Sequence, residues 1–131
     1  MGCGKQKFSG GNQGKLNYIL DDIEARQNDN ISFLYLSHLE KANLSNLDLS
    51  NRNLSRVNFR KAYFSGANLT GSNLTDADMT LANLSGVIMD GPEISSIKSF
   101  HFTTIPERLI PWLSSHKDFA AALPTLKIVD N

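Results

Sequence analysis

The chain has 131 residues, which is enough for one domain with a hydrophobic core of moderate size. Its 13 basic and 13 acidic residues give a formal net charge of zero, so no overall field draws the molecule to nucleic acid or to an anionic membrane. The single cysteine excludes an internal disulfide, and no apolar run is long enough for a membrane-spanning helix. We therefore expect a soluble, cytoplasmic protein that does not bind nucleic acid directly.

Residues 1–14 contain five glycines and no periodic apolar pattern, so we expect a flexible leader. The alternative is a lipidation signal, in which Gly2 is myristoylated and Cys3 is palmitoylated beside two nearby lysines. The myristoylation pattern asks for Ser or Thr at position 6, where this chain has Gln6. On this hypothesis a membrane is a partner only if Gly2 or Cys3 is acylated.

Residues 15–28 predict one amphipathic helix. Its apolar side chains follow the i, i+3, i+4, i+7 spacing of a single helix face, and they are Leu16, Ile19, Leu20 and Ile23. A helix of this length is only marginally stable by itself and must bury that face against something. Because a repetitive segment begins a few residues later, we expect the helix to cap its open end.

From residue 32 to residue 96 a bulky apolar residue recurs at every fifth position. The residue before it is usually Asn or Asp, and the residue two before it is usually small. A period of five fits neither a strand nor a helix, but it suits one short side of a coil plus a corner, with two of five side chains pointing inward. The apolar series is Leu34, Leu39, Leu44, Leu49, Leu54, Phe59, Phe64, Leu69, Leu74, Met79, Leu84, Met89 and Ile94.

These units, best seen as ANLTG at 67–71 and ANLSG at 82–86, resemble the pentapeptide-repeat family. The resemblance implies an all-β solenoid, a right-handed quadrilateral β-helix with four units per coil. Residues 32–96 would then form about three coils, stacked at the roughly 4.8 Å spacing of neighbouring strands. Exposed strand edges at both ends of such a stack invite unwanted pairing, so we expect a cap at each end.

The corner residues, two after each large apolar residue, show a superperiod of twenty. Two corners of every coil carry Asn or Gly, and the other two never do. Since Asn and Gly tolerate positive φ, we predict type II turns at their corners and negative-φ turns at the others. The same superperiod predicts four inner columns: Leu34/Leu54/Leu74/Ile94, Leu39/Phe59/Met79, Leu44/Phe64/Leu84 and Leu49/Leu69/Met89.

Arg52 breaks the pattern, because it occupies an inward position that is otherwise small. Its predicted column is Ser32, Arg52, Ser72 and Pro92. A buried, unpaired charge is costly, so either the hydroxyl groups above and below serve the guanidinium or the unit bulges and the side chain reaches water.

Residues 97–131 have a different composition and predict a mixed, partly helical C-terminal cap. We expect regular structure to fade at Gly91-Pro92, since Pro cannot donate to a ladder. A short helical turn is predicted at 107–110, and a longer helix from a serine cap at 114 or 115 to about 123. Trp112 is among the apolar residues that would close the stack, and it is a candidate contact for a homodimer.

No set of residues predicts a catalytic, cofactor or metal site. The three histidines, at 38, 101 and 116, are far apart and lack metal-ligand spacing, and no pair of acids converges. The chain is therefore expected not to be an enzyme and to need no cofactor.

Partner binding is the remaining class, and the candidate patch lies on adjoining faces of the first two coils. It consists of Lys41, Arg56, Arg60 and Lys61. A solvated face with pairing between coils is the alternative, because exposed ion pairs are common and contribute little. Tyr63 and Leu81 are the outward apolar residues, too few to define a patch by themselves.

We therefore predict a non-enzymatic protein–protein interaction module with an unknown protein partner. The first alternative is a DNA-mimic regulator or protector of a type II topoisomerase, a role that the family resemblance implies for some relatives. The zero net charge and the small number of coils count against it. The second alternative is a lipid-tethered adaptor or bacterial effector, which depends on Gly2 and Cys3.

Overall fold

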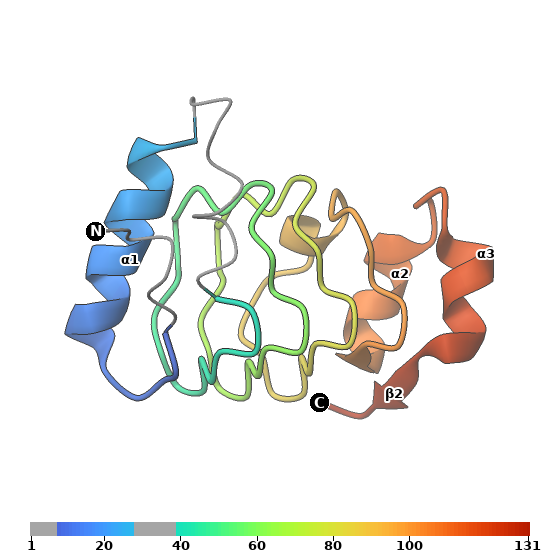
Figure 1. The fold of residues 1–131 in the computed structure, drawn as a ribbon. Helices are drawn as coiled ribbons and strands as arrows, with labels where there is room; N and C mark the ends of the chain where they lie inside the picture. Colours follow the sequence, from blue (N-terminus) through green and yellow to red (C-terminus); the bar gives the residue numbers. More distant parts are fainter. Residues whose placement is uncertain (1–7, 28–38) are drawn as a thin grey trace.

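The computed structural model describes residues 8–27 and 39–131 (Figure 1). Helix α1 (Gln13–Ala25) lies at one end of a stack of coils, and helices α2 (Ile110–Leu113) and α3 (Phe119–Ala122) lie at the other end. The other elements are, in order, η3 (Pro92–Ile94), β1 (Thr104–Pro106), η4 (Glu107–Leu109), η5 (Leu123–Thr125) and β2 (Lys127–Val129).

The repetitive segment is held together by isolated parallel bridges between residues twenty apart. Asn43 pairs with Tyr63, and Tyr63 pairs in turn with Asn83. The backbone N–H of Leu44 donates to Tyr63 at 2.8 Å, and that of Tyr63 donates to Ala42 at 2.9 Å. The twenty-residue superperiod is therefore confirmed. Each extended stretch is so short that it holds one bridge between two turns, and the only named strands of the described residues are β1 and β2.

The large residue of each repeat unit points into the stack. Every described member of the four predicted inner columns is buried, which confirms that these side chains point inward; Leu34 lies outside the described residues. Phe59 and Phe64 meet edge to face, with ring centroids 5.2 Å apart. The alanines two positions before the large residues, such as Ala62 and Ala67, are also fully buried. This filled interior makes the repeats a stable support for the side chains on their surface.

All corners of the described repeats have positive φ, so the predicted negative-φ turns are wrong. Lys41 has φ 63°, Arg56 64° and Leu81 63°, close to the 63° of Asn46. The reason is that most corners close the same backbone turn, as when the N–H of Ala42 donates to the carbonyl of Leu39, three residues earlier. The geometry of the coil sets φ, and the side chain must tolerate it.

The last coil contains one extra residue. Asp78 pairs with Ser99 and Asn83 with Thr104, an offset of 21 where the earlier coils have 20. The irregularity coincides with Gly91, at φ 130°, and with the 3₁₀ turn η3 that follows it. Regular pairing is therefore interrupted at Gly91-Pro92, where it was expected to fade, but it resumes with the bridges at Ser99 and Thr104.

The N-terminal region differs from the expected flexible leader over residues 8–14. Phe8 is 2% exposed and belongs to the hydrophobic core, and the N–H of Asn43 donates to Ser9 at 3.1 Å. Helix α1 begins at Gln13, two residues earlier than predicted, because the Asn12 side chain caps it by accepting from the N–H of Lys15. Gly2 and Cys3 lie outside the described residues.

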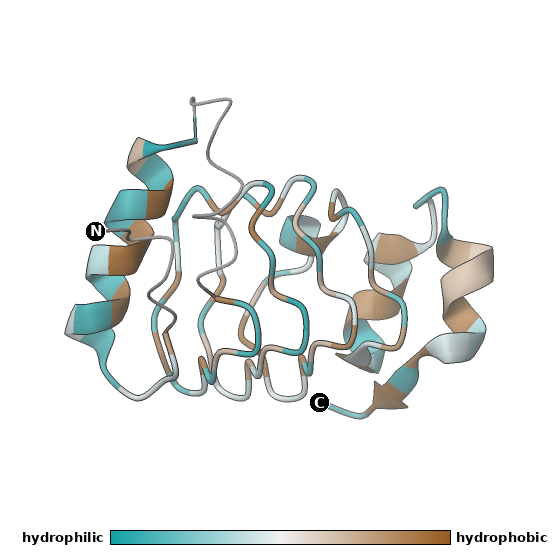
Figure 2. Ribbon diagram, viewed as in Figure 1, coloured by the Kyte–Doolittle hydropathy of each residue, from teal (hydrophilic) through white to brown (hydrophobic). Residues whose placement is uncertain are grey.

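Helix α1 covers the first coil with the predicted apolar face. Leu16, Leu20 and Ile23 are fully buried, and Ile19 packs against the same core. In Figure 2 the hydrophobic side of α1 faces the coils and its hydrophilic side faces away. The helix has the position of a cap, as the sequence predicts.

The C-terminal region is more broken than predicted. The single helix expected from 114 or 115 to 123 is wrong: the chain forms α2 and α3 with turns between them, and Asp118 precedes α3. Strand β2, which was not predicted, pairs in parallel with β1 through Ile105 and Ile128. Within residues 8–27 and 39–131, no helix is long and apolar enough to cross a membrane.

Candidate interaction surface

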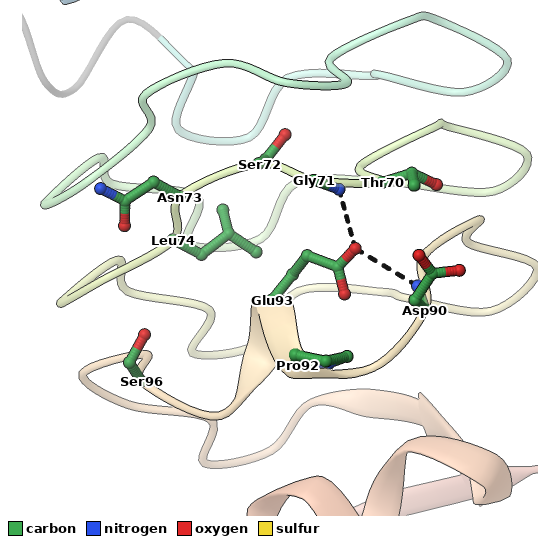
Figure 3. Close-up of a pocket in the computed structure, with 9 residues that line it drawn as sticks. All are labelled: Thr70, Gly71, Ser72, Asn73, Leu74, Asp90, Pro92, Glu93 and Ser96. Atoms are coloured by element: carbon green, nitrogen blue, oxygen red, sulfur yellow. Dashed lines mark hydrogen bonds between the residues drawn. The ribbon is translucent and has the colours of Figure 1, made fainter.

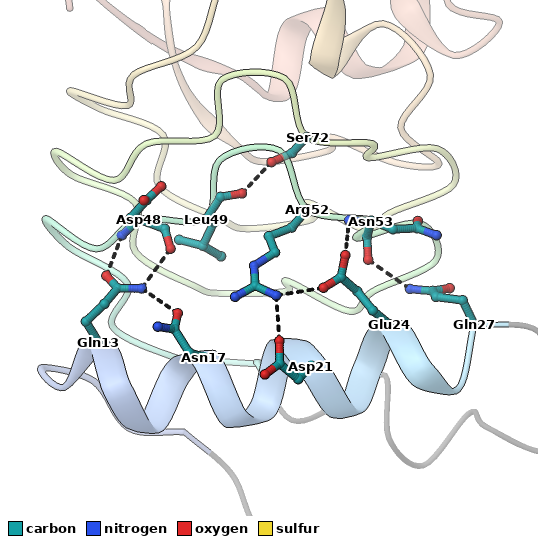
Figure 4. A network of polar contacts seen from close by, with 10 residues as sticks. All are labelled: Gln13, Asn17, Asp21, Glu24, Gln27, Asp48, Leu49, Arg52, Asn53 and Ser72. Carbon is teal, nitrogen blue, oxygen red and sulfur yellow. Dashed lines mark hydrogen bonds and ion pairs between the residues drawn. The ribbon is translucent and has the colours of Figure 1, made fainter.

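Arg52 joins the first coil to α1 (Figure 4). Its Nη1 donates to Asp21 Oδ1 and to Glu24 Oε1, each at 2.7 Å. These two carboxylates, Asp21 first, raise the pKa of Arg52. The predicted hydroxyl partners of Arg52 are therefore wrong, since its partners come from the capping helix and the Ser72 hydroxyl donates to Leu49 instead. The side chain leaves its column, as the second expectation had it, and is 24% exposed beside α1.

Side chains of α1 and of Gln27, just after it, take the place of a neighbouring coil at the exposed edge. The amide of Gln13 accepts from the N–H of Asp48 at 2.7 Å and donates to the carbonyl of the same residue at 2.9 Å (Figure 4). Glu24 accepts from the N–H of Asn53 at 2.9 Å, and Gln27 donates to the carbonyl of Asn53 at 3.2 Å. These four bonds satisfy backbone groups that a further coil would otherwise pair. The α1 end of the stack is thus covered by contacts within the molecule.

Two of the four predicted basic residues also bind groups of the same chain. Arg56 donates through Nη2 to the carbonyl of Gln27, just after α1. Arg60 forms an ion pair with Asp78 at 3.5 Å. Lys41 and Lys61 are exposed and have no ion pair with any described residue. The structure therefore separates the predicted patch into two arginines with internal partners and two lysines that form no ion pair among the described residues.

Backbone hydrogen bonds place the two lysines in one column of corners. The N–H of Lys41 donates to the residue before Lys61, at 2.8 Å, and the N–H of Lys61 to the residue before Leu81, at 3.1 Å. The N–H of Leu81 donates to His101 at 3.0 Å, so the next corner is Phe102. We call this column, consisting of Lys41, Lys61, Leu81 and Phe102, the corner ridge.

The corner ridge combines exposure with an unfavourable backbone conformation. Leu81 is 43% exposed and Phe102 59%, and both lie in the left-handed region, at φ 63° and 58°. Sequence reasoning missed Phe102 because the twenty-residue superperiod points to His101, and the extra residue in the last coil moves the corner by one. Phe102 could have been found from the sequence only by recognising that the coil containing Gly91-Pro92 has 21 residues and not 20.

The C-terminal segment contacts the Phe102 end of the corner ridge. Thr125 Oγ1 accepts from the N–H of Phe102 at 2.9 Å, and the N–H of Lys127 donates to the carbonyl of Thr103 at 3.0 Å. Lys127 is exposed in strand β2. A third lysine therefore lies near the apolar end of the corner ridge.

A groove of about 430 Å³ lies beside the irregular turn, on another part of the coils (Figure 3). Glu93, which is 9% exposed, points into the turn and accepts from the N–H groups of Gly71 and Gly91 at 2.8 Å and of Asp90 at 3.3 Å. Burial by itself would raise the pKa of Glu93, but the backbone donors, first that of Gly71, bring the pKa below its usual value. The carboxylate thus replaces the backbone acceptor that the extra residue displaces.

Comparison with known proteins gives one match. Residues 53–91 match the family model described as pentapeptide repeats, in eight copies. This segment consists of pentapeptide repeats. Searches of curated proteins and of solved structures gave no match. Of the corner ridge, Lys61 and Leu81 lie within the matched repeats, while Lys41 and Phe102 lie in the coils on either side.

Trp112 and His116 belong to the C-terminal cap that follows the pentapeptide repeats. The Trp112 indole lies against Gly91, so that a Cβ there would overlap the ring, and the side chain is 42% exposed. His116 Nδ1 accepts from the N–H of Asp118, which leaves Nε2 to donate to the carbonyl of Ile97. Among the described residues, no three His, Cys, Asp or Glu side chains are placed to hold a metal ion. The homodimer contact through Trp112 stays a prediction.

Proposed function

We propose that this protein is a non-enzymatic protein–protein interaction module that binds its partner through the corner ridge. The pentapeptide repeats would supply a rigid support, a right-handed quadrilateral β-helix, which is the fold that such repeats imply. The observation that carries the proposal is the presence of two exposed apolar side chains, Leu81 and Phe102, on adjacent left-handed corners.

Stability alone does not explain these side chains. A bulky residue in the left-handed region costs about 1–3 kcal/mol, and such strain is commonly found at functional sites. Two other corner columns of the same coils use residues that avoid most of this cost, namely Asn46/Gly66/Gly86 and Asn51/Gly71/Gly91. Exposing apolar surface adds a further unfavourable contribution that a bound partner would remove.

The alternatives have less support. A mimic of DNA needs a surface dominated by negative charge, whereas the corner ridge carries Lys41 and Lys61. Membrane tethering depends on Gly2 and Cys3 and stays a prediction. The homodimer through the C-terminal cap likewise rests on sequence reasoning about Trp112.

The proposal can be tested by photo-crosslinking in the protein's native cells. A benzophenone amino acid is placed at Leu81 and, as a matched control, at Ile88, which is 51% exposed on a different face of the same repeats. We expect a discrete protein adduct at Leu81 and no such adduct at Ile88. Identical adducts at both positions, or none at Leu81, would contradict the proposal.

A further inference from the structure

The spacing of the corner ridge restricts the shape of its partner. Successive corners belong to successive coils, which pair through single parallel bridges. Neighbouring strands lie about 4.8 Å apart, so the four corners from Lys41 to Phe102 span roughly 14 Å in a line along the stack. A partner that contacts all four must present side chains at this interval.

An α-helix matches this interval better than a strand does. Three helical residues rise about 4.5 Å, so positions i, i+3, i+7 and i+10 on one face follow the corners closely. Residues on one face of a strand are about 6.6–6.8 Å apart, so a strand along the same line loses register after the second corner. A helix laid along the corner ridge is therefore the better geometric fit.

The charge of the corner ridge restricts the chemistry of that helix. Lys41 and Lys61 project at one end without an ion pair among the described residues, and Lys127 is exposed beyond the other end. On the flank, Arg60 and Asp78 neutralise each other. The corner ridge is thus basic at Lys41 and Lys61 and apolar at Leu81 and Phe102, with Lys127 beyond its apolar end.

We infer that the corner ridge binds an acidic amphipathic helix of a partner protein. Carboxylates of the helix face Lys41 and Lys61, and apolar side chains one to two turns further along cover Leu81 and Phe102. This inference rests on the proposed interaction function and adds the chemical class and the secondary structure of the partner.

The test measures the fluorescence anisotropy of a labelled, alanine-rich helical peptide titrated with the full chain. The peptide carries Glu at i and i+3 and Leu at i+7 and i+10, and a second peptide has the reverse order, since either direction along the ridge is allowed. The control peptide has the same composition with the four residues spread around the helix. We expect one of the ordered peptides to bind at least about tenfold more tightly than the control peptide.

Two double variants separate charge from apolar contact. Asn is the replacement in both because it tolerates the left-handed conformation. Lys41→Asn/Lys61→Asn should weaken binding about tenfold and flatten its salt dependence, while Leu81→Asn/Phe102→Asn should weaken it similarly and leave the salt dependence in place. Asp76→Asn, at an exposed left-handed corner of another column, is the matched control and should change nothing.

Equal affinity for the ordered and control peptides, or equal affinity of all variants, would overturn the inference. So would binding of phosphatidylserine vesicles or of duplex DNA through the same residues in the absence of peptide binding, since the occupant would then be a different one. If Leu81 crosslinks to a protein and the peptides do not bind, the proposed function stands and this inference fails. If Leu81 crosslinks to nothing, the proposed function itself fails.

Discussion

Removal of the Glu93 carboxylate should unfold the irregular turn of the last coil more readily than any surface change nearby. The carboxylate accepts three backbone N–H groups, those of Gly71 and Gly91 at 2.8 Å and that of Asp90 at 3.3 Å. An unsatisfied buried donor costs about 1–3 kcal/mol, and the adjoining groove lets water reach part of the turn, so we expect Glu93→Ala to lose about 2–4 kcal/mol of unfolding free energy. The urea midpoint should fall by about 1–2 M.

The pH dependence of this loss identifies the charge as its cause. Because the folded-state pKa of Glu93 is lowered, its contribution is present above the unfolded-state pKa, about 4.3, and is lost as the pH falls through the folded-state value. The difference in urea midpoint between wild type and Glu93→Gln should therefore be large at pH 7 and shrink towards pH 3. Asp90→Asn, a neutralised acid in the same turn, is the control and should have little effect at pH 7.

Equal stability of wild type and Glu93→Gln at pH 7 would refute this reasoning. A difference that stays the same from pH 7 to pH 3 would also refute it, because it would assign the loss to the shape of the side chain and not to its charge.

Three further changes test other parts of the structure. Leu81→Asn should raise the unfolding free energy by about 0.5–1 kcal/mol in urea titrations, because Asn relieves left-handed strain; a loss would show that Leu81 packs more than its exposure indicates. Arg52→Met should lower the unfolding free energy by about 1–2 kcal/mol, since the ion pairs with α1 are partly exposed. It should also speed amide hydrogen exchange in α1, and unchanged exchange would show that Arg52 does not hold α1 against the coils. Phe8→Ala should cost about 3–5 kcal/mol in the same urea assay, and a loss under 1 kcal/mol would place Phe8 outside the core.

Much of the repeat structure was predictable because one rule governs every unit. Each coil repeats the pattern of the one below, so the sequence period carries the vertical pairing of Asn43 with Tyr63 and Tyr63 with Asn83 directly. The backbone conformation at the corners was not predictable from residue type. Lys41 and Leu81 have no preference for positive φ, and they adopt it because the neighbouring coils leave the turn no other geometry.

The parts that were not predicted depend on contacts between distant segments. Arg52 looked like a break in its own column, and its partners lie about thirty residues earlier, on one face of α1. Phe102 entered the corner ridge only through the extra residue of the last coil. Lys41 and Lys61 were predicted as partner-binding residues, and the structure adds that they share one column with two exposed apolar corners.

The most direct test of the central claim is to map the contact of the acidic helical peptide on the isotope-labelled protein by backbone amide chemical shifts. We predict that the largest changes follow the corner ridge, at Lys41, Lys61, Leu81 and Phe102, one residue in each successive coil. Changes centred on α1 or on the groove at Glu93, with the corner ridge unaffected, would contradict it.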